Sequence, residues 1–286
     1  MVIHRRTIAR PVALQGPALF TGLDASMSVL PAPAGTGIVL RTKEDEAPAT
    51  IAHLSDKPVH PAFAGRRPRC TTLAVGTHTV AMTEHALGAL AGLGITDAII
   101  ETRAPELPID DGSAGTLTAE ILSAGVTILD DTIEPIRLRE PIEFSDADAV
   151  ITAEPFDGID YAYHLDYGQG SPIPAATARW TGDADDFARS IAPARTFSTS
   201  EEAEQARAAG LFARFTPADL LVIGPGGPID NAWRFADEPA RHKLLDLIGD
   251  LALLARPLYA RVRAHKSGHA DTHALCRLVL RSLSNK

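Results

Sequence analysis

The spacing of hydrophobic positions changes several times along the first 126 residues, and each change predicts an element. Between residues 83 and 95 the apolar residues follow helical spacing, so we expect a helix that Thr83 caps and that Gly92 and Gly94 end. Shorter apolar runs bounded by Pro and Gly have the alternation and β-branched content of strands. They predict strands at 25–32, 37–42, 71–80 and 97–103, with a second short helix at 116–125.

After residue 126 the same order of strands and then helices begins again. We therefore predict an α+β protein of two domains, 1–126 and 127–286, each a layer of helices on a small mixed sheet. The active site is expected in the cleft where the two domains meet. The second half is predicted to have strands within 133–146 and 148–168 and at 219–227 and 258–266, and helices at 183–193, 198–212, 236–255 and 270–283.

Composition narrows the class of protein. The chain has 286 residues, 45% hydrophobic and 22% charged, which is the balance of a globular protein. Its net charge of −9 and pI near 5.5 disfavour binding to nucleic acid or to anionic membranes. Basic residues do cluster at 65–70 and 261–266, so a local pocket for an anionic small molecule is compatible with the overall charge.

Cysteine content and the N-terminal segment indicate the compartment. With only Cys70 and Cys276 the chain has neither a disulfide framework nor a cysteine zinc site, which fits a reducing environment. No signal-peptide pattern opens the chain, and no segment has the ~18 apolar residues of a membrane span. We expect a cytoplasmic protein with no integral membrane segment, and the sequence leaves the oligomeric state open.

One predicted helix carries an unexpected polar stripe. In "RHKLLDLIGD" (241–250) the leucines form an apolar face, while His242, Asp246 and Asp250 recur every four residues along one other face. A His and an Asp one turn apart are close enough to share a metal ion. The alternative is an exposed ion pair between His242 and Asp246, worth a few tenths of a kcal/mol.

Two further segments have residues suited to acid–base chemistry. Glu84 and His85 stand in the first turn of an otherwise apolar helix, where one could bind a metal and the other serve as a base. They could equally be a Glu placed against the helix dipole and a His at the rim. His269 is expected in a turn after the strand ending at Lys266, a common place for a catalytic histidine but also for a surface one.

Together these segments resemble a known family. "TEH" (83–85), "PIDDGSAG" (108–115), "ARTF" (194–197), "RHKLLDLIGD" and "KSGHA" (266–270) have the order and approximate spacing found in UDP-3-O-acyl-N-acetylglucosamine deacetylases, the zinc amidases of lipid A biosynthesis. The resemblance extends to "RRTIARPV" and "PAPAGTGIVLR" near the start of the chain. It implies a Zn²⁺-dependent hydrolase that removes the acetyl group from an acylated nucleotide sugar.

The resemblance also implies a role for each site residue. Zinc would be held by His85, His242 and Asp246, and Glu84 would take a proton from the water on the metal. His269, kept protonated by Asp250, would stabilise the oxyanion and supply a proton to the leaving amine. On the substrate side, the implied residues are Thr196 for the tetrahedral intermediate, Phe197 for the sugar, and Lys243 for the anionic diphosphate or the sugar.

The chain departs from the family pattern at positions that concern the acyl chain. Phe20 in "ALFTG" stands where family members usually have His, and "GLFARFTPADL" (210–220) replaces their Gly-Gly-Ser segment. The helix "STSEEAEQARAAG" (198–210) is mostly polar, although burying an acyl chain needs apolar contact worth about 0.8 kcal/mol per methylene. A deacetylase of an N-acetyl sugar without the long acyl chain is therefore an alternative, and a non-catalytic metal-binding protein is a further one.

Two glycine-rich segments are predicted to be turns. "GPGG" (224–227) lacks the Lys-Ser/Thr that follows in a phosphate-binding loop. "DDGSAG" (110–115) has the composition of turn chemistry rather than of a separate nucleophile or metal site.

Overall fold

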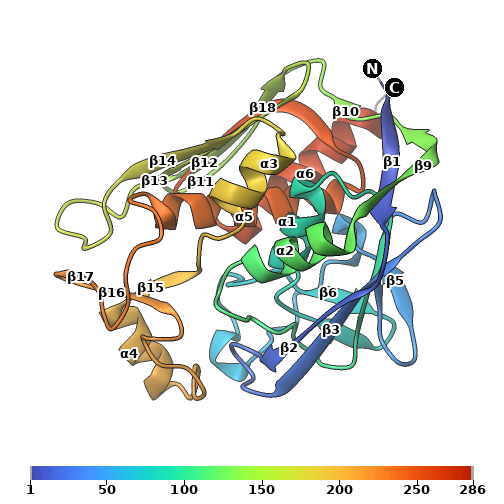
Figure 1. The fold of residues 1–286 in the computed structure, drawn as a ribbon. Helices are drawn as coiled ribbons and strands as arrows, with labels where there is room; N and C mark the ends of the chain where they lie inside the picture. Colours follow the sequence, from blue (N-terminus) through green and yellow to red (C-terminus); the bar gives the residue numbers. More distant parts are fainter. Residues whose placement is uncertain (1, 285–286) are drawn as a thin grey trace.

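The computed structural model describes residues 2–284 and confirms the predicted α+β class. Two mixed sheets lie on either side of a central layer of helices, in which α1, α2, α5 and α6 are prominent (Figure 1). The main sheet strands of the first half all fall before residue 126, and those of the second half all fall after it. The helical bounds are α1 (Glu84–Gly92), α2 (Gly115–Ala124), α3 (Ala184–Asp186), α4 (Ser200–Ala208), α5 (Glu238–Leu251) and α6 (His269–Ser284).

The sheet of the first half has the order β2-β3-β8-β4-β5, with β4 parallel to β8 and its other pairs antiparallel. Its central strand, β8, has an alternating burial pattern, which fits a sheet with one face on the helices. The bounds are β2 (Val12–Pro17), β3 (Asp24–Pro31), β4 (Ile38–Arg41), β5 (Glu46–Pro48) and β8 (Ala98–Thr102).

The sheet of the second half has the order β11-β12-β18-β13-β14, and the short strand β10 pairs with β18. In β18, Leu258, Ala260, Val262 and Ala264 are buried, while the residues between them are less so. This two-residue period turns the apolar face of the central strand toward the helices. The bounds are β10 (Ile136–Arg137), β11 (Ile142–Asp146), β12 (Ala149–Pro155), β13 (Ile159–Leu165), β14 (Ala176–Trp180) and β18 (Leu258–His265).

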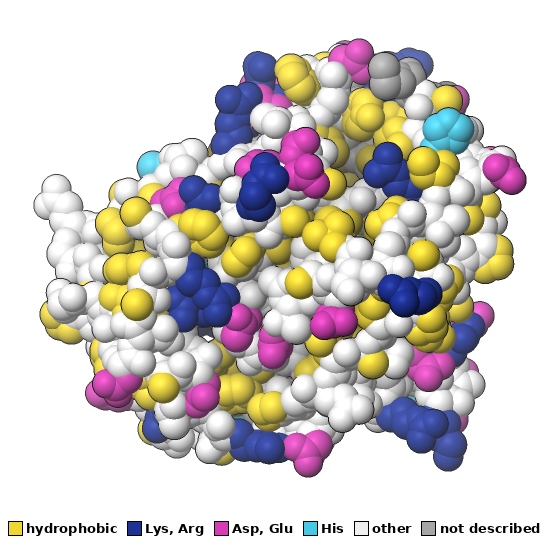
Figure 2. All heavy atoms as spheres, in the orientation of Figure 1, with side chains coloured by type: hydrophobic (Ala, Val, Ile, Leu, Met, Phe, Trp, Pro, Cys, Tyr) yellow, Lys and Arg dark blue, Asp and Glu magenta, His cyan; other side chains and the backbone are white. Residues whose placement is uncertain are grey.

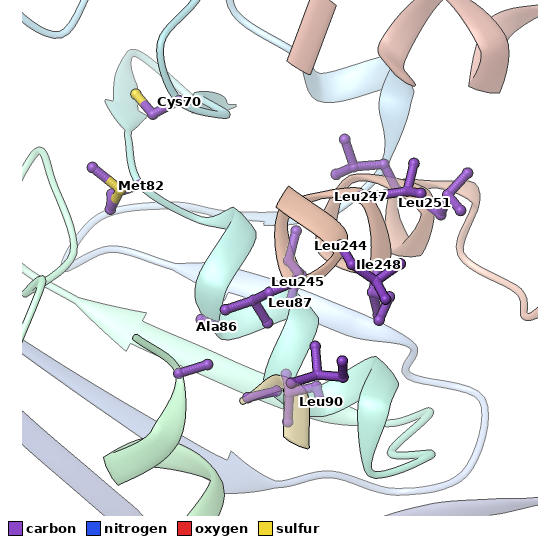
Figure 3. Packing of buried hydrophobic residues seen from close by; sticks show 14 of the residues in the cluster. Cys70, Met82, Ala86, Leu87, Leu90, Leu244, Leu245, Leu247, Ile248 and Leu251 are labelled. Carbon is purple, nitrogen blue, oxygen red and sulfur yellow. The ribbon is translucent and has the colours of Figure 1, made fainter. Parts of the chain in front are cut away.

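The core between the sheets is centred on the contact of α1 with α5. Leucines and Ile248 from both helices interdigitate there (Figure 3). Two glycines let the helices approach closely, because a Cβ added at Gly249 would lie 2.0 Å from the carbonyl oxygen of Glu84, and one at Gly88 would lie 2.8 Å from Cδ1 of Leu245. The first polar residues of α1 are thereby held against the polar stripe of α5.

A two-stranded sheet links the halves at one edge. Strand β1 (Ile3–Ile8) pairs antiparallel with β9 (Val126–Ile133), the strand that begins the second half. The N-terminal strand is therefore paired with residues on the other side of the predicted boundary. The division into domains at 126 and 127 stays a prediction.

A small unit formed by residues 197–228 projects at the lower left of Figure 1. It consists of β15 (Phe197–Thr199), α4, β16 (Leu221–Gly224) and β17 (Gly227–Pro228). A capping box opens α4: the Thr199 hydroxyl accepts from the Glu202 N–H, and the Glu202 carboxylate accepts from the Thr199 N–H. The predicted turn at "GPGG" is confirmed, and it joins β16 to β17.

Four local predictions were wrong. Residues 71–80 form a hairpin, β6 (Leu73–Val75) and β7 (His78–Val80), because Gly76 turns the chain with φ +58°. Thr83 precedes α1, but its hydroxyl donates to the carbonyl of Thr71 instead of capping the helix. The helix expected at 183–193 changes after α3 into a π-helical turn, in which the N–H of Ala192 donates to the carbonyl of Phe187. His269 begins α6 rather than projecting from a turn.

Acidic and basic side chains are interspersed over the face shown in Figure 2, without an extended field of one sign. Among residues 2–284, none of the helices combines the length and the apolar content needed to cross a membrane.

Candidate active site

Three potential metal ligands converge at the contact of α1 with α5. His85 comes from the first turn of α1, and His242 and Asp246 lie one turn apart on α5. Oδ1 of Asp246 is 3.4 Å from Nε2 of His242 and 3.6 Å from Nε2 of His85. The potential ligand atoms of the three residues all lie within 4.8 Å of one another. All three side chains are largely buried, so the exposed ion pair considered for His242 and Asp246 is not what forms.

The chemistry of these three residues fits a zinc ion. Oδ1 of Asp246 is buried and has no hydrogen-bond partner among the described residues, a costly arrangement for a carboxylate oxygen unless a cation meets it. Nδ1 of His242 lies 3.1 Å from the carbonyl oxygen of Ala194, which leaves Nε2 to face the cluster. Burial lowers the pKa of His242 to about 4, so its imidazole is in the neutral form that binds metals.

Glu84 lies beside this cluster and is positioned by the backbone. Its Oε2 accepts a hydrogen bond of 2.9 Å from the N–H of Thr71, and its Oε1 is 3.8 Å from Nε2 of His269. Burial raises the pKa of Glu84 above its ordinary value. A carboxylate with a raised pKa is a stronger base, which suits proton abstraction near neutral pH.

His269 faces Glu84 and is paired with Asp250. Nδ1 of His269 is 2.8 Å from Oδ2 of Asp250, and its Nε2 is 4.0 Å from Oδ2 of Asp246. Burial alone would lower the pKa of His269, but the Asp250 carboxylate raises it to about 9. The imidazole is therefore charged at neutral pH and can donate a proton from Nε2. The predicted contact of Asp250 with His269 is confirmed.

Of these groups, His242, Asp246 and His269 line a pocket of about 500 Å³. Basic residues from both predicted clusters reach it: Arg67 and Arg69 from 65–70, and Lys266 from 261–266. Arg261 and Arg263 of the second cluster bond to Asp160 on the sheet instead. Basic residues distant in the sequence thus meet at this pocket, where Arg67 pairs with Asp271, Arg69 with Glu202 and Lys266 with Asp166.

The three remaining predicted residues also line this pocket. The ring of Phe197 lies 6.2 Å from that of His242, edge to face. The backbone of Thr196 is fixed by a hydrogen bond of 2.6 Å from its N–H to the carbonyl of Gly112. Lys243 donates to Oδ2 of Asp246 at 2.8 Å, so part of its charge is already compensated within the protein.

Comparison with known proteins shows the family of this chain. A model of the family described as UDP-3-O-acyl N-acetylglycosamine deacetylase matches residues 5–281. The chain belongs to this family. It is 34% identical to the UDP-3-O-acyl-N-acetylglucosamine deacetylase of Cellvibrio japonicus over 98% of this chain and 91% of that protein. The deacetylases of Leptospira biflexa and Anaeromyxobacter dehalogenans are 32% and 34% identical, over 98% and 97% of this chain and 90% and 87% of their own lengths.

Phe20 and Phe212, at two of the departures from the family pattern, belong to one aromatic cluster with Phe63. The ring of Phe20 lies 4.9 Å from that of Phe63, edge to face, and 6.0 Å from that of Phe212. Residues from the start of the chain therefore pack against the turn that follows α4.

Sequence reasoning missed two residues of the hydrogen-bond network. The hydroxyl of Thr71 donates to Oδ1 of Asp250 at 2.5 Å, and Nε2 of His273 lies 3.5 Å from the same oxygen. His273 could have been found, because it follows His269 by four residues on the same helix. Thr71 had no such signal, since its place beside Asp250 depends on the tertiary fold.

Proposed function

We propose that this protein is a zinc-dependent hydrolase that removes the acetyl group from UDP-3-O-acyl-N-acetylglucosamine, a step of lipid A biosynthesis. The observation that carries the proposal is the placement of Glu84 and His269 opposite each other beside the His85, His242 and Asp246 cluster. A protein that only stored or sensed metal would need the three ligands but not a buried base and a charged acid next to them.

His85, His242 and Asp246 would hold the zinc ion, which, when bound, supplies Lewis acidity at the amide carbonyl and lowers the pKa of bound water. Glu84 accepts a proton as the water oxygen bonds to the acetyl carbon. His269 stabilises the negative charge that develops on the carbonyl oxygen. As the C–N bond breaks, His269 gives a proton to the amine nitrogen, and acetate and the free amine are released.

The basic side of the pocket suits an anionic nucleotide sugar. Arg67, Arg69 and Lys266 lie along the pocket, and the Asp246 carboxylate raises the pKa of Lys243, so its ammonium stays charged despite burial. Both cysteines are free and buried thiols, which suits a reducing compartment. We therefore infer that the reaction takes place in the cytoplasm.

The test measures acetate release from UDP-3-O-acyl-N-acetylglucosamine by the zinc-loaded protein. Glu84→Gln and His269→Gln should each lower kcat by ~10²–10⁴-fold, because each removes one proton transfer. Metal analysis should find an unchanged zinc content in both variants, since neither residue is a proposed ligand. Glu120→Gln is the matched control, because Glu120 is an exposed glutamate on α2 that does not line the pocket.

Full activity in Glu84→Gln would show that Glu84 is not the base. Loss of zinc together with activity would instead make Glu84 a ligand. If neither the native protein nor any variant released acetate while zinc remained bound, the non-catalytic alternative would be the better account.

A further inference from the structure

Thr71 is completely buried and lies next to the proposed acid and base without taking part in either proton transfer. It belongs to the segment just before β6, and it contacts residues of α1, α5 and α6. Its backbone N–H, its carbonyl oxygen and its hydroxyl all make hydrogen bonds. One threonine therefore meets all three helices that carry Glu84, Asp250 and His269.

The backbone of Thr71 holds the proposed base. Its N–H donates to Oε2 of Glu84 at 2.9 Å. Its carbonyl oxygen accepts from the hydroxyl of Thr83 at 3.1 Å and from the N–H of Thr83 at 3.2 Å. Because Thr83 directly precedes Glu84, these bonds fix the start of α1 against residue 71. They use backbone atoms of residue 71, so they do not depend on its side chain.

The side chain of Thr71 reaches the acid side of the site. Its hydroxyl oxygen lies 2.5 Å from Oδ1 of Asp250. The other oxygen of that carboxylate, Oδ2, is 2.8 Å from Nδ1 of His269. The Asp250 carboxylate is thus held at both oxygens, so Thr71 helps to set the direction in which this carboxylate meets the His269 ring.

The direction of each hydrogen bond follows from the groups present. Although burial would raise the pKa of Asp250, the neighbouring His269 and His273 hold it below its ordinary value, so the carboxylate is ionised and can only accept. The single hydroxyl proton of Thr71 therefore goes to Asp250. Nε2 of His273 lies 3.0 Å from the same hydroxyl oxygen, and by elimination it is the donor there. His273 thus leaves the Thr71 proton directed at Asp250.

These contacts connect the base to the acid. The hydrogen-bonded path runs from Glu84 through the N–H and the hydroxyl of Thr71 to Asp250, and from there to His269. Nε2 of His269 and Oε1 of Glu84 are 3.8 Å apart, which is too long for a hydrogen bond. The two side chains are therefore held relative to each other through Thr71 rather than by a bond of their own.

We propose that Thr71 is a positioning residue of the deacetylation, which aligns the acid His269 with the base Glu84 through Asp250. The inference rests on the proposed function, because that function gives His269 and Glu84 their roles. Thr71 does not line the pocket of about 500 Å³, so it acts through these side chains and not on the substrate. Without its hydroxyl, Oδ1 of Asp250 is left with Nε2 of His273 at 3.5 Å, and the carboxylate can turn away from His269.

The experiment compares Thr71→Val and Thr71→Ser in acetate release from UDP-3-O-acyl-N-acetylglucosamine. Valine keeps the backbone N–H that meets Glu84 but lacks the hydroxyl. It should lower kcat by roughly 10–100-fold with KM and zinc content unchanged, because a hydrogen bond to a charged group is lost. Serine keeps the hydroxyl and should return kcat to near the native value. Full kcat in Thr71→Val, or a loss in Thr71→Ser as large as in Thr71→Val, would overturn the inference.

Thr118→Val is the matched control. Thr118 is a buried threonine on α2 whose hydroxyl has no hydrogen-bond partner among the described residues. The same substitution there removes a buried hydroxyl outside the network, so kcat should be unchanged.

A double-mutant cycle distinguishes positioning from general damage to the fold. If Thr71 acts through His269, adding Thr71→Val to His269→Gln should change kcat by less than about 2-fold, because the acid that Thr71 aligns is already absent. A further loss of about 10-fold or more in the His269→Gln background would assign Thr71 a structural role instead.

NMR spectra of the histidine rings separate this inference from the proposed function. The Nδ1–H proton of His269, assigned by its loss in His269→Gln, should shift in Thr71→Val and keep its position in Thr71→Ser. If the native protein releases no acetate, the proposed function is wrong, and the spectra still decide whether Thr71 aligns Asp250 with His269. An unchanged Nδ1–H signal in Thr71→Val would contradict the inference even in an active deacetylase.

Discussion

At the scale of single residues, Asp250 organises the acid side of the site. It meets His269 at 2.8 Å, Thr71 at 2.5 Å and His273 at 3.5 Å, and it is itself almost completely buried. Its charge raises the pKa of His269 against the opposing effect of burial. In the proposed mechanism, His269 can act as the acid because Asp250 keeps its imidazole protonated.

Asp250→Asn should therefore move the alkaline limit of the reaction. In the native protein, activity that needs protonated His269 is lost as the pH rises through its pKa of about 9. Burial lowers the pKa of His269 and Asp250 is the main group that raises it, so without this carboxylate the pKa of His269 falls and activity is lost at lower pH. The measurement is the pH profile of kcat/KM. Asp160→Asn, which neutralises a buried carboxylate on the distant sheet, should leave the alkaline limb in place.

At the scale of elements, the site depends on how closely α1 approaches α5. Gly249→Ala would place a methyl group 2.0 Å from the backbone oxygen of Glu84, and a backbone atom cannot move aside unless the helix moves. The gain in helix propensity, about 1 kcal/mol, is smaller than the ~1–3 kcal/mol cost of overpacking. We expect lower stability and a roughly 10-fold or greater loss of zinc affinity, because His85 would shift away from α5.

Substitutions at two other glycines serve as controls for Gly249→Ala. Gly88→Ala would meet the end of the Leu245 side chain, which can change rotamer, and would lie 3.3 Å from the Leu245 carbonyl oxygen. This backbone contact is much milder than the one at Gly249, so the effect on zinc affinity should be smaller. Gly226→Ala meets nothing within 4 Å and should have no effect. Zinc competition titrations rank the zinc affinities of the three variants, and thermal melts rank their stabilities. Equal zinc affinity in Gly249→Ala and Gly226→Ala would show that the helix contact does not position the ligands.

The same helix contact shows what sequence could and could not predict. The i, i+4, i+8 stripe on α5 and the Glu-His pair on α1 were visible, because helical spacing fixes which side chains share a face. Only the family resemblance predicted that these two groups of residues lie together, because local spacing does not show that α1 crosses α5 at Gly249. The hairpin at 71–80 and the bond from Thr71 to Asp250 likewise depend on long-range packing.

At the scale of the whole molecule, the proposed zinc ligands come from both halves of the chain. The halves also share the β1–β9 sheet and the leucine core between α1 and α5. Because the core is continuous across the predicted domain boundary, the halves are expected to unfold in one transition. Both tryptophans, Trp180 and Trp233, lie in the second half, so their fluorescence reports on that half while circular dichroism reports on the whole chain.

Zinc removal should lower the temperature of that single transition. A ligand at about 1,000 times its Kd stabilises the folded state by ~4 kcal/mol, which corresponds to a shift on the order of 10 °C in a protein of this size. Chelation should therefore lower the Tm by fluorescence and by circular dichroism equally, and added zinc should restore it. Asp246→Asn, which removes a ligand from α5, should abolish the response to zinc in both signals. Two separate transitions, or a shift in fluorescence alone, would mean that zinc stabilises the second half and that the two halves unfold independently.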